Sequence, residues 1–570
     1  MSIREQLTKN KTVLILLLAM MLFGFYLRSF HLDFPSIGYH NMKENEYLSQ
    51  AALQQQEGDY LRRKMHIFGR EATPYFEEYP QMPILPWLFQ IMWFVFGNEF
   101  WAARIILVLF SIATIPLLYV LTKNITKSDY IALTAAFLFS FMPLAVFFGR
   151  NIQPETPALF FLLLGMIYYT DYLEHHTKAN AMRMGLALAF AAIFKPTFLI
   201  GLIPMAAIFS FEKLKETKFR TGFLKHAGWA AVAFSPMPMW NVISSFLNVD
   251  QSLTQGTLAR VDLFRVFTAT YWNQYWPTIN AYIADNYTWF YVYLMMLGLG
   301  ILLLKYSTPI ARFLLAYTLA IIPYGMILAD YLKAHSYYQF PFLPLVCMAC
   351  AFAIYTIGML LKQLTNIRYI QFAALLILLI PISDVQAHTD AQYNTIFYGL
   401  DATADFLKAN AGPTDRLWMS GHAQSFGVCY NSGMWCGPPW WDDLNKTIRY
   451  EDERNFRWLF VHGAQGLMEL RATEVCGNKA FDEDGNVATP CPTDEFESRQ
   501  QIWEYFENNY RIRLIGLGPQ QNNGQPIPTV YLFEKGGNFS LSELNAIPYR
   551  QEQKTYDVKG GQAQMLVLTT

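Results

Sequence analysis

The chain has 570 residues, of which 53% are hydrophobic and only 15% are charged. So apolar a composition excludes an ordinary soluble protein of this length. The formal net charge of −1 decides little, because the distribution of Lys and Arg matters more than their sum in a membrane protein.

The apolar residues gather in runs that approach or reach the roughly 20 residues needed to cross a bilayer. Four of these runs are TVLILLLAMMLFGFYL (12–27), IILVLFSIATIPLLYVL (105–121), ALFFLLLGMIYY (158–169) and FAALLILLIPI (372–382). The first follows a basic start and has no small-residue cleavage site after it, which predicts a retained anchor rather than a removed signal peptide. The chain is therefore predicted to be a polytopic α-helical membrane protein.

We predict about eleven transmembrane helices from these runs. They lie near residues 12–30, 100–122, 130–149, 155–173, 182–196, 198–211, 225–246, 287–304, 309–330, 338–360 and 369–386. Lys and Arg concentrate in alternate loops, most densely between residues 213 and 225. The positive-inside rule then places the N-terminus in the cytoplasm and the tail outside the cell membrane. Residues 1–386 are predicted to form the transmembrane domain and residues 387–570 a soluble extracytoplasmic domain.

One apolar stretch is too short for a span. PILPWLFQIMWFVFG (83–97) is rich in Trp and Phe and opens with prolines. Aromatic rings favour the membrane interface, so we expect a helix that lies on the outer membrane surface. The first external loop, residues 31–99, would then follow the membrane closely.

The tail mixes helical and extended patterns. Helix-like DATADFLKANA (401–411) and ESRQQIWEYFENNY (497–510) alternate with strand-like RLWMSG, RWLFVHG, RIRLIGLG and TVYLFEK. This alternation predicts a small α/β domain.

Four of the six cysteines lie in the tail, and they are Cys429, Cys436, Cys476 and Cys491. An even number in an exported domain predicts two disulfides, with 429–436 and 476–491 the simplest of three pairings. A zinc site is the weaker alternative, because no CxxC or HxxxH motif accompanies these cysteines.

Polar and ionisable residues converge at the predicted external ends of the spans. They are His40, Lys43, Glu44, Glu46, Glu77, Glu78, Arg150, Glu155, Lys195, Lys333, His335, Tyr337 and Tyr338. Ionisable groups at membrane depth are costly, so they usually line a cavity or a substrate pathway.

Structural roles can account for several of these residues one at a time. Glu44 and Glu46 can face a helix dipole or water, and Glu155 after Pro154 can be a helix-start acid. Arg150 and Lys333 can extend to the interface, and a lone His335 is often only a hydrogen-bonded structural residue. Lys195, in AAIFKPTFL, has no acid near it in the sequence. We therefore expect Lys195 to pair with a carboxylate distant in the sequence or with a phosphate.

The order of these motifs resembles the GT-C membrane glycosyltransferases, in particular the protein O-mannosyltransferase and aminoarabinose transferase (ArnT-like) group. The resemblance covers nearly the whole chain. It rests on KENEYLSQA, Gly58-Asp59, EEYPQMPILPWLFQIMWFVFG, EFWAARIIL, GRNIQPETPALFF, FKPTFL and HSYYQFPFLP. It implies a GT-C fold and the inverting transfer of a hexosyl or pentosyl group from a polyprenyl-phosphate sugar to an acceptor hydroxyl at the external membrane face.

The resemblance also implies roles for individual residues. Its first-loop carboxylate acts as general base, here Glu46 or Glu44. The family's Asp-Glu pair aligns with Lys43-Glu44, whereas a related His-x-Trp-Arg-x-x-Asp pattern aligns its His with His40 and its acid with Glu46, which is slightly preferred. Glu155 would match the second acid and could take part in holding a divalent metal, the one cofactor considered. Lys195 and His335 would lie near the donor phosphate. The other substrate-binding candidates are His40, Lys43, Glu78, Arg150, Tyr337 and Tyr338.

Two other functions remain open from the sequence. A transporter or flippase of lipid-linked sugars would also need a polar cavity, but not a carboxylate at reacting distance. A non-catalytic receptor or assembly subunit would use the tail, where Trp435, Trp440 and Trp441 can bind a partner. The expected partners are membrane lipids, the lipid-linked donor and a protein, glycolipid or glycan acceptor, and no nucleic acid.

Overall fold

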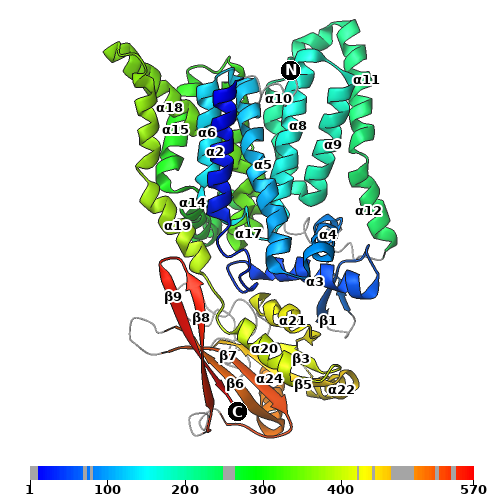
Figure 1. The fold of residues 1–570 in the computed structure, drawn as a ribbon. Helices are drawn as coiled ribbons and strands as arrows, with labels where there is room; N and C mark the ends of the chain where they lie inside the picture. The colour runs from blue at the N-terminus through cyan, green and yellow to red at the C-terminus, as the bar shows by residue number, and fades with distance from the viewer. Residues whose placement is uncertain are drawn as a thin grey trace. The chain divides into compact units, whose positions relative to one another are not determined.

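The structure, a computed structural model, describes residues 10–68, 74–76, 81–247, 264–419, 423–438, 443–463, 493–519, 526–540 and 547–570 (Figure 1). The chain divides into two compact units. The first, here called the helical unit, contains Met1–Asp33 and Glu78–Gln392, and the second, called the sheet unit, contains Phe34–Glu77 and Tyr393–Thr570. The predicted domain boundary after residue 386 remains a prediction.

Helices build the helical unit. They are α2 (Lys11–Arg28), α4 (Ile84–Phe96), α5 (Phe100–Thr126), α6 (Asp129–Phe141), α7 (Pro143–Phe147), α8 (Glu155–His175), α9 (Lys178–Phe194), α10 (Leu202–Ala207), α11 (Thr217–Phe234), α12 (Pro236–Phe246), α14 (Trp276–Tyr287), α15 (Trp289–Leu303), α16 (Pro309–Leu319), α17 (Ile321–Ala334), α18 (Leu343–Thr365) and α19 (Ile382–Asn394). Short 3₁₀ segments include η1 (Pro196–Gly201), η5 (Ser336–Phe342) and η6 (Ile370–Leu379). Helices α2, α5, α6, α8 and α9 run side by side (Figure 1).

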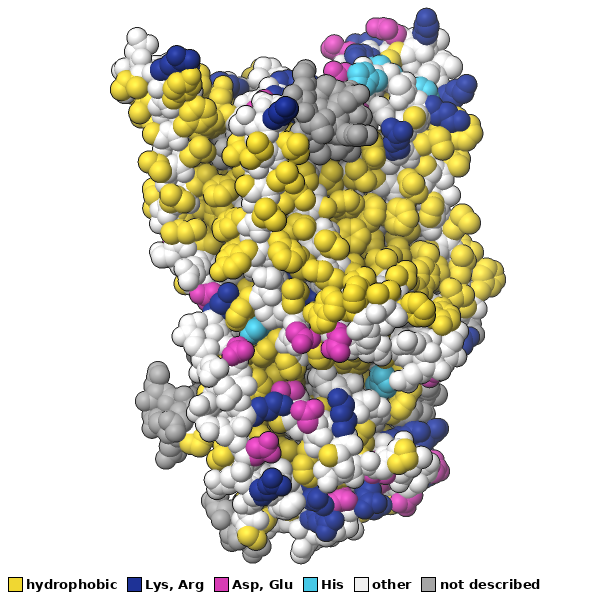
Figure 2. Space-filling model, viewed as in Figure 1, with side chains coloured by type: hydrophobic (Ala, Val, Ile, Leu, Met, Phe, Trp, Pro, Cys, Tyr) yellow, Lys and Arg dark blue, Asp and Glu magenta, His cyan; other side chains and the backbone are white. Residues whose placement is uncertain are grey.

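The helical unit has the surface of a multi-pass membrane protein. Among the described residues, six helical stretches are long and apolar enough to cross a membrane, or seven if the bent pair Tyr271–Tyr287 and Trp289–Leu303 is one span. Hydrophobic side chains cover a broad band of this unit (Figure 2). A soluble surface would not expose so large an apolar area. The predicted polytopic α-helical class is confirmed, while the count of about eleven spans remains a prediction.

The aromatic stretch after residue 83 is helical, as predicted. In α4, Leu85, Phe89 and Trp93 recur every four residues and are buried. Phe94 on the opposite side is 88% exposed. A helix with one packed and one exposed apolar face suits the membrane interface, where we still expect α4 to lie.

A buried arginine joins the first helices of the bundle. Arg28 at the end of α2 donates Nε to Ser111 Oγ on α5 at 2.8 Å and Nη1 to the carbonyl of Ser140 on α6 at 2.9 Å. These bonds offset the cost of burying a guanidinium group among apolar helices. At Gly149 a Cβ atom would come within 2.6 Å of Arg28 Nε, so only glycine fits where the chain turns toward α8.

The sheet unit is an α/β domain, which confirms the predicted class. Its strands are β1 (Lys64–Phe68), β2 (Pro74–Phe76), β3 (Arg416–Met419), β4 (Cys436–Gly437), β5 (Phe456–His462), β6 (Tyr510–Leu517), β7 (Pro528–Lys535), β8 (Arg550–Val558) and β9 (Gly561–Thr569). Within the described residues they form one nine-stranded sheet in the order β2-β1-β4-β3-β5-β7-β6-β9-β8. Its helices are α3 (Asn41–Glu57), α20 (Leu400–Asn410), α21 (Phe426–Ser432), α22 (Leu444–Arg454) and α24 (Thr493–Asn509).

Two apolar layers hold the helices against the sheet. Side chains alternate along β5 from Trp458 on, so Trp458 and Phe460 pack in one core and Leu459 and Val461 in the other. The helices and strands predicted in the tail are present as α20, α24, β3, β5, β6 and β7. No local pattern predicts that β1 from the first loop pairs in parallel with β4, through Ile67 and Cys436.

A disulfide joins Cys429 on α21 to Cys436 on β4. It ties the middle of a seven-residue helix to a strand of only two residues inside the apolar core. Cys476 and Cys491 lie outside the described residues, so the second pair remains a prediction. Cys347 and Cys350 are buried free thiols on α18.

Candidate functional site

A buried ion pair connects two neighbouring helices of the helical unit. Lys195 Nζ lies 2.9 Å from Glu155 Oε1, and the two side chains are 13% and 2% exposed. Glu155 is the first residue of α8, where the helix dipole favours a carboxylate, and Lys195 is the residue that ends α9. Because α8 and α9 are antiparallel neighbours, the start of one meets the end of the other. The distant acid that the sequence requires for Lys195 is therefore Glu155.

Aromatic residues of η5 surround the lysine. The ammonium group lies 3.4 Å from the Tyr338 hydroxyl, and it lies over the rings of Tyr338 and Tyr337 at 4.5 and 5.4 Å. His335 stacks on Tyr337 with ring centroids 5.0 Å apart. A cation held over aromatic faces in a dry setting gains cation–π stabilisation. Five predicted site residues, Glu155, Lys195, His335, Tyr337 and Tyr338, thus lie together in the structure.

Two other predicted cations contact different groups. Arg150 donates Nη1 to the carbonyl oxygen of His31 at 2.9 Å. Lys333 on α17 lies over the ring of Tyr275 at 4.7 Å. Substrate binding by Arg150 remains a prediction. Glu77 and Glu78 lie outside the described residues.

The structure adds residues that the sequence analysis missed. Gln153 is fully buried, and neither of its side-chain amide atoms has a hydrogen-bond partner among the described residues. Tyr324 donates its hydroxyl to the backbone carbonyl of Tyr338 at 2.7 Å and so helps to fix η5. A buried amide without a partner is rare in proteins and is suited to receive a polar ligand. The signal in the sequence was the polar run RNIQPE ahead of an apolar span.

The first-loop acids lie on α3 in the sheet unit. Glu44 is buried and accepts a hydrogen bond from Ser36 Oγ at 3.0 Å. Glu46, whose side chain is 7% exposed, pairs with Lys43 Nζ at 2.6 Å. Alternate residues on a helix point in different directions, so the two carboxylates have different surroundings. His40 precedes the helix in a left-handed conformation, with φ 57°.

Glu46 borders a small hollow inside the sheet unit. Its walls include Ser49, His66 and Tyr430, and its volume of about 10 Å³ suits one water molecule. His66 Nδ1 lies 2.6 Å from Ser49 Oγ, and burial lowers the pKa of His66 to about 4. Ser49 and His66 were not among the predicted site residues, because their contact depends on the packing of β1 against α3.

The sheet unit is expected to lose stability in mild acid. The pKa of His66 falls from 6.5 in the unfolded chain to about 4 in the folded chain, so the unfolded state takes up its proton first. The loss begins as the pH falls through 6.5 and reaches about 3 kcal/mol near pH 4. Thermal melts of the full chain in detergent between pH 7.5 and pH 4 measure it. His66→Gln should flatten this pH dependence, and an unchanged profile in that variant would refute the assignment to His66.

The site does not fit a divalent metal. The Lys195 ammonium group occupies the place beside the Glu155 carboxylate that a cation would need. Across the described ranges, no three His, Cys, Asp or Glu side chains come together in a metal-binding group. We therefore derive no step through a metal.

Comparisons with known proteins agree with this architecture. A family model described as dolichyl-phosphate-mannose-protein mannosyltransferase matches residues 79–240, a stretch that contains Glu155 and Lys195. The crystal structure of ArnT from Cupriavidus metallidurans bound to undecaprenyl phosphate superposes with a TM-score of 0.52 at 11% identity, over 80% of this chain and 94% of that chain. The chain has a GT-C fold. The resemblance to the GT-C membrane glycosyltransferases predicted from the sequence is thereby confirmed.

A second ArnT structure, in the apo state, covers 80% of this chain and 93% of that chain at 10% identity, with a TM-score of 0.46. A comparison with curated protein sequences gives no match. At a sequence identity of 11%, the structural similarity to ArnT defines only the fold. The activity has to be argued from the residues themselves.

Proposed function

We propose that the chain is an inverting glycosyltransferase that moves a sugar from a polyprenyl-phosphate donor to an acceptor hydroxyl at the external membrane face. The GT-C fold and the match to a mannosyltransferase family model support the class of reaction. The ArnT structure with bound undecaprenyl phosphate supports the class of donor.

The observation that carries the proposal is the buried Lys195–Glu155 pair with its aromatic surround. An ammonium group in a dry site is suited to bind the phosphate of a lipid-linked sugar. Glu155 keeps Lys195 charged and oriented when no donor is bound. His335, stacked beside Tyr337, can donate a further hydrogen bond to a phosphate oxygen.

The transfer itself needs a base and a stabilised leaving group. The acceptor oxygen bonds to the anomeric carbon, the bond from that carbon to the phosphate oxygen breaks, and the acceptor proton passes to a carboxylate. Attack opposite to the leaving phosphate inverts the anomeric centre. We assign the base to Glu46, the acid that the family pattern gives when its His aligns with His40. Both acids have a partner inside the sheet unit, Glu46 with Lys43 and Glu44 with Ser36. Lys195 stabilises the charge left on the polyprenyl phosphate.

Mass spectrometry of reaction products tests the proposal. The purified chain in lipid nanodiscs would be incubated with a panel of polyprenyl-phosphate sugars and crude envelope acceptors. We expect a product heavier by one sugar, formed by the wild type and lost with Glu46→Gln. Donor movement across the bilayer without any glycosylated product would instead identify a transporter of lipid-linked sugars.

A further inference from the structure

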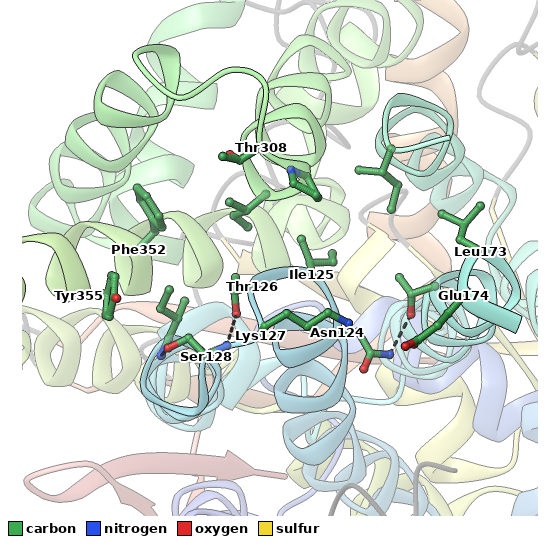
Figure 3. Close-up of a pocket in the computed structure, with 15 residues that line it drawn as sticks. Asn124, Ile125, Thr126, Lys127, Ser128, Leu173, Glu174, Thr308, Phe352 and Tyr355 are labelled. Carbon is green, nitrogen blue, oxygen red and sulfur yellow. Dashed lines mark hydrogen bonds between the residues drawn. The ribbon is translucent and has the colours of Figure 1, made fainter. Parts of the chain in front are cut away.

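A large cavity lies in the helical unit at the far end of α8 from Glu155. Its volume is about 640 Å³, and it is lined by the last turns of α5 and α8, the first turns of α6 and α16, and part of α18 (Figure 3). Helix α8 has 21 residues and is therefore about 30 Å long, which is close to the hydrocarbon thickness of a bilayer. The cavity is thus separate from the Lys195–Glu155 site.

Most uncharged polar groups of the cavity wall are bonded within the protein. Asn124 Nδ2 donates to Thr170 Oγ1 at 2.9 Å. Ser128 and Thr308 cap the helices that follow them, and each hydroxyl oxygen accepts from a backbone N–H at 3.4 Å. These groups have little capacity left for a ligand.

Two opposite charges in the same wall are available. Lys127 follows α5 and Glu174 lies in the last turn of α8, and both are exposed to the cavity. Neither forms an ion pair with any described residue, whereas the nearby Lys123 and Asp129 pair at 3.0 Å. Figure 3 shows the Lys127 side chain extended along the cavity toward Asn124 and Glu174.

The rest of the wall is apolar and belongs to helices that can cross a membrane. Its apolar side chains include Ile125, Ile131, Ile208, Ile310 and Phe352. Helices α5 and α8, and the stretches that contain α16 and α18, all pass the length and composition test for a span. The ends of spanning helices lie at the level of the lipid headgroups. A ligand of this cavity should therefore carry both charges and a hydrocarbon tail.

We propose that the cavity binds an aminophospholipid, whose headgroup carries a phosphate and a primary ammonium. The phosphate would lie against Lys127, and the ammonium against Glu174. One acyl chain would cover the isoleucine and phenylalanine wall. An anionic lipid without an amine would leave Glu174 facing a like charge, and a simple cation would leave Lys127 unmatched. This site is independent of the proposed transferase activity.

Native mass spectrometry of the full chain in detergent tests the proposal, with titrations of phosphatidylethanolamine, phosphatidylglycerol and soluble glycerophosphoethanolamine. We expect phosphatidylethanolamine to bind about fivefold tighter than phosphatidylglycerol. Lys127→Gln or Glu174→Gln should each weaken the affinity for phosphatidylethanolamine about threefold, the size of effect expected for an exposed charge pair. Glu174→Gln should also reduce the difference in affinity between phosphatidylethanolamine and phosphatidylglycerol. Lys305→Gln and Glu212→Gln, two exposed charges outside the cavity wall, serve as matched controls without effect.

Two results would overturn the proposal. If phosphatidylethanolamine and phosphatidylglycerol bind with equal affinity, and Glu174→Gln changes neither affinity, the ammonium is not recognised. Binding of glycerophosphoethanolamine as tight as that of phosphatidylethanolamine would show that the hydrocarbon tail adds nothing and that the ligand is not a lipid.

Discussion

Glu46→Gln should reduce sugar transfer by about 100-fold or more while the protein stays folded, since general bases contribute factors of this size. The amide keeps the shape of the side chain and can still contact Lys43, which pairs with Glu46 at 2.6 Å. It cannot take the acceptor proton. Single-turnover assays with a saturating polyprenyl-phosphate sugar in nanodiscs measure the loss at the chemical step.

Three companion variants identify the base. Glu57→Gln changes an exposed acid at the end of the same helix, which pairs with Lys64, and should leave transfer unchanged. Glu44→Gln should reduce the rate of sugar transfer less than Glu46→Gln does, if Glu44 serves mainly to accept the hydrogen bond from Ser36. Full activity in Glu46→Gln would move the base to Glu44. Full activity in the double variant Glu44→Gln/Glu46→Gln would end the general-base model for this chain.

Lys195→Met should weaken donor binding by roughly 10- to 100-fold, the range expected for loss of one charge-assisted hydrogen bond to phosphate. The same change leaves Glu155 buried without its partner, which is expected to cost about 3–5 kcal/mol of stability. A drop in binding could then reflect poor folding. Stability and donor affinity therefore have to be measured on the same preparations.

A paired variant separates the two effects. Lys195→Met/Glu155→Leu removes both charges and should recover most of the lost stability, because apolar replacements of a buried ion pair are often tolerated. Donor affinity should stay low, since the ammonium group is still missing. Titration with undecaprenyl phosphate and thermal melts of each variant give both quantities. Wild-type affinity in the double variant would show that Lys195 has only a structural role.

The sequence on its own determined which segments are apolar enough for the membrane and which are suited to water. Long apolar runs predict the helical unit, because a bilayer admits only segments of sufficient length and hydrophobicity. Local periodicity predicts α4, α20 and the strands β3, β5, β6 and β7, because side-chain direction repeats with the backbone. The cost of charge among apolar residues singles out Lys195 and Glu155 before any partner is known.

Tertiary structure decided which of these residues meet. Lys195 and Glu155 become partners because α8 and α9 pack antiparallel, and Ser49 meets His66 because β1 packs on α3. The parallel pairing of β1 with β4 brings a first-loop segment into the sheet of the tail. Local patterns follow from backbone geometry and burial. Pairings between distant segments depend instead on how whole elements pack, which no short stretch of sequence encodes.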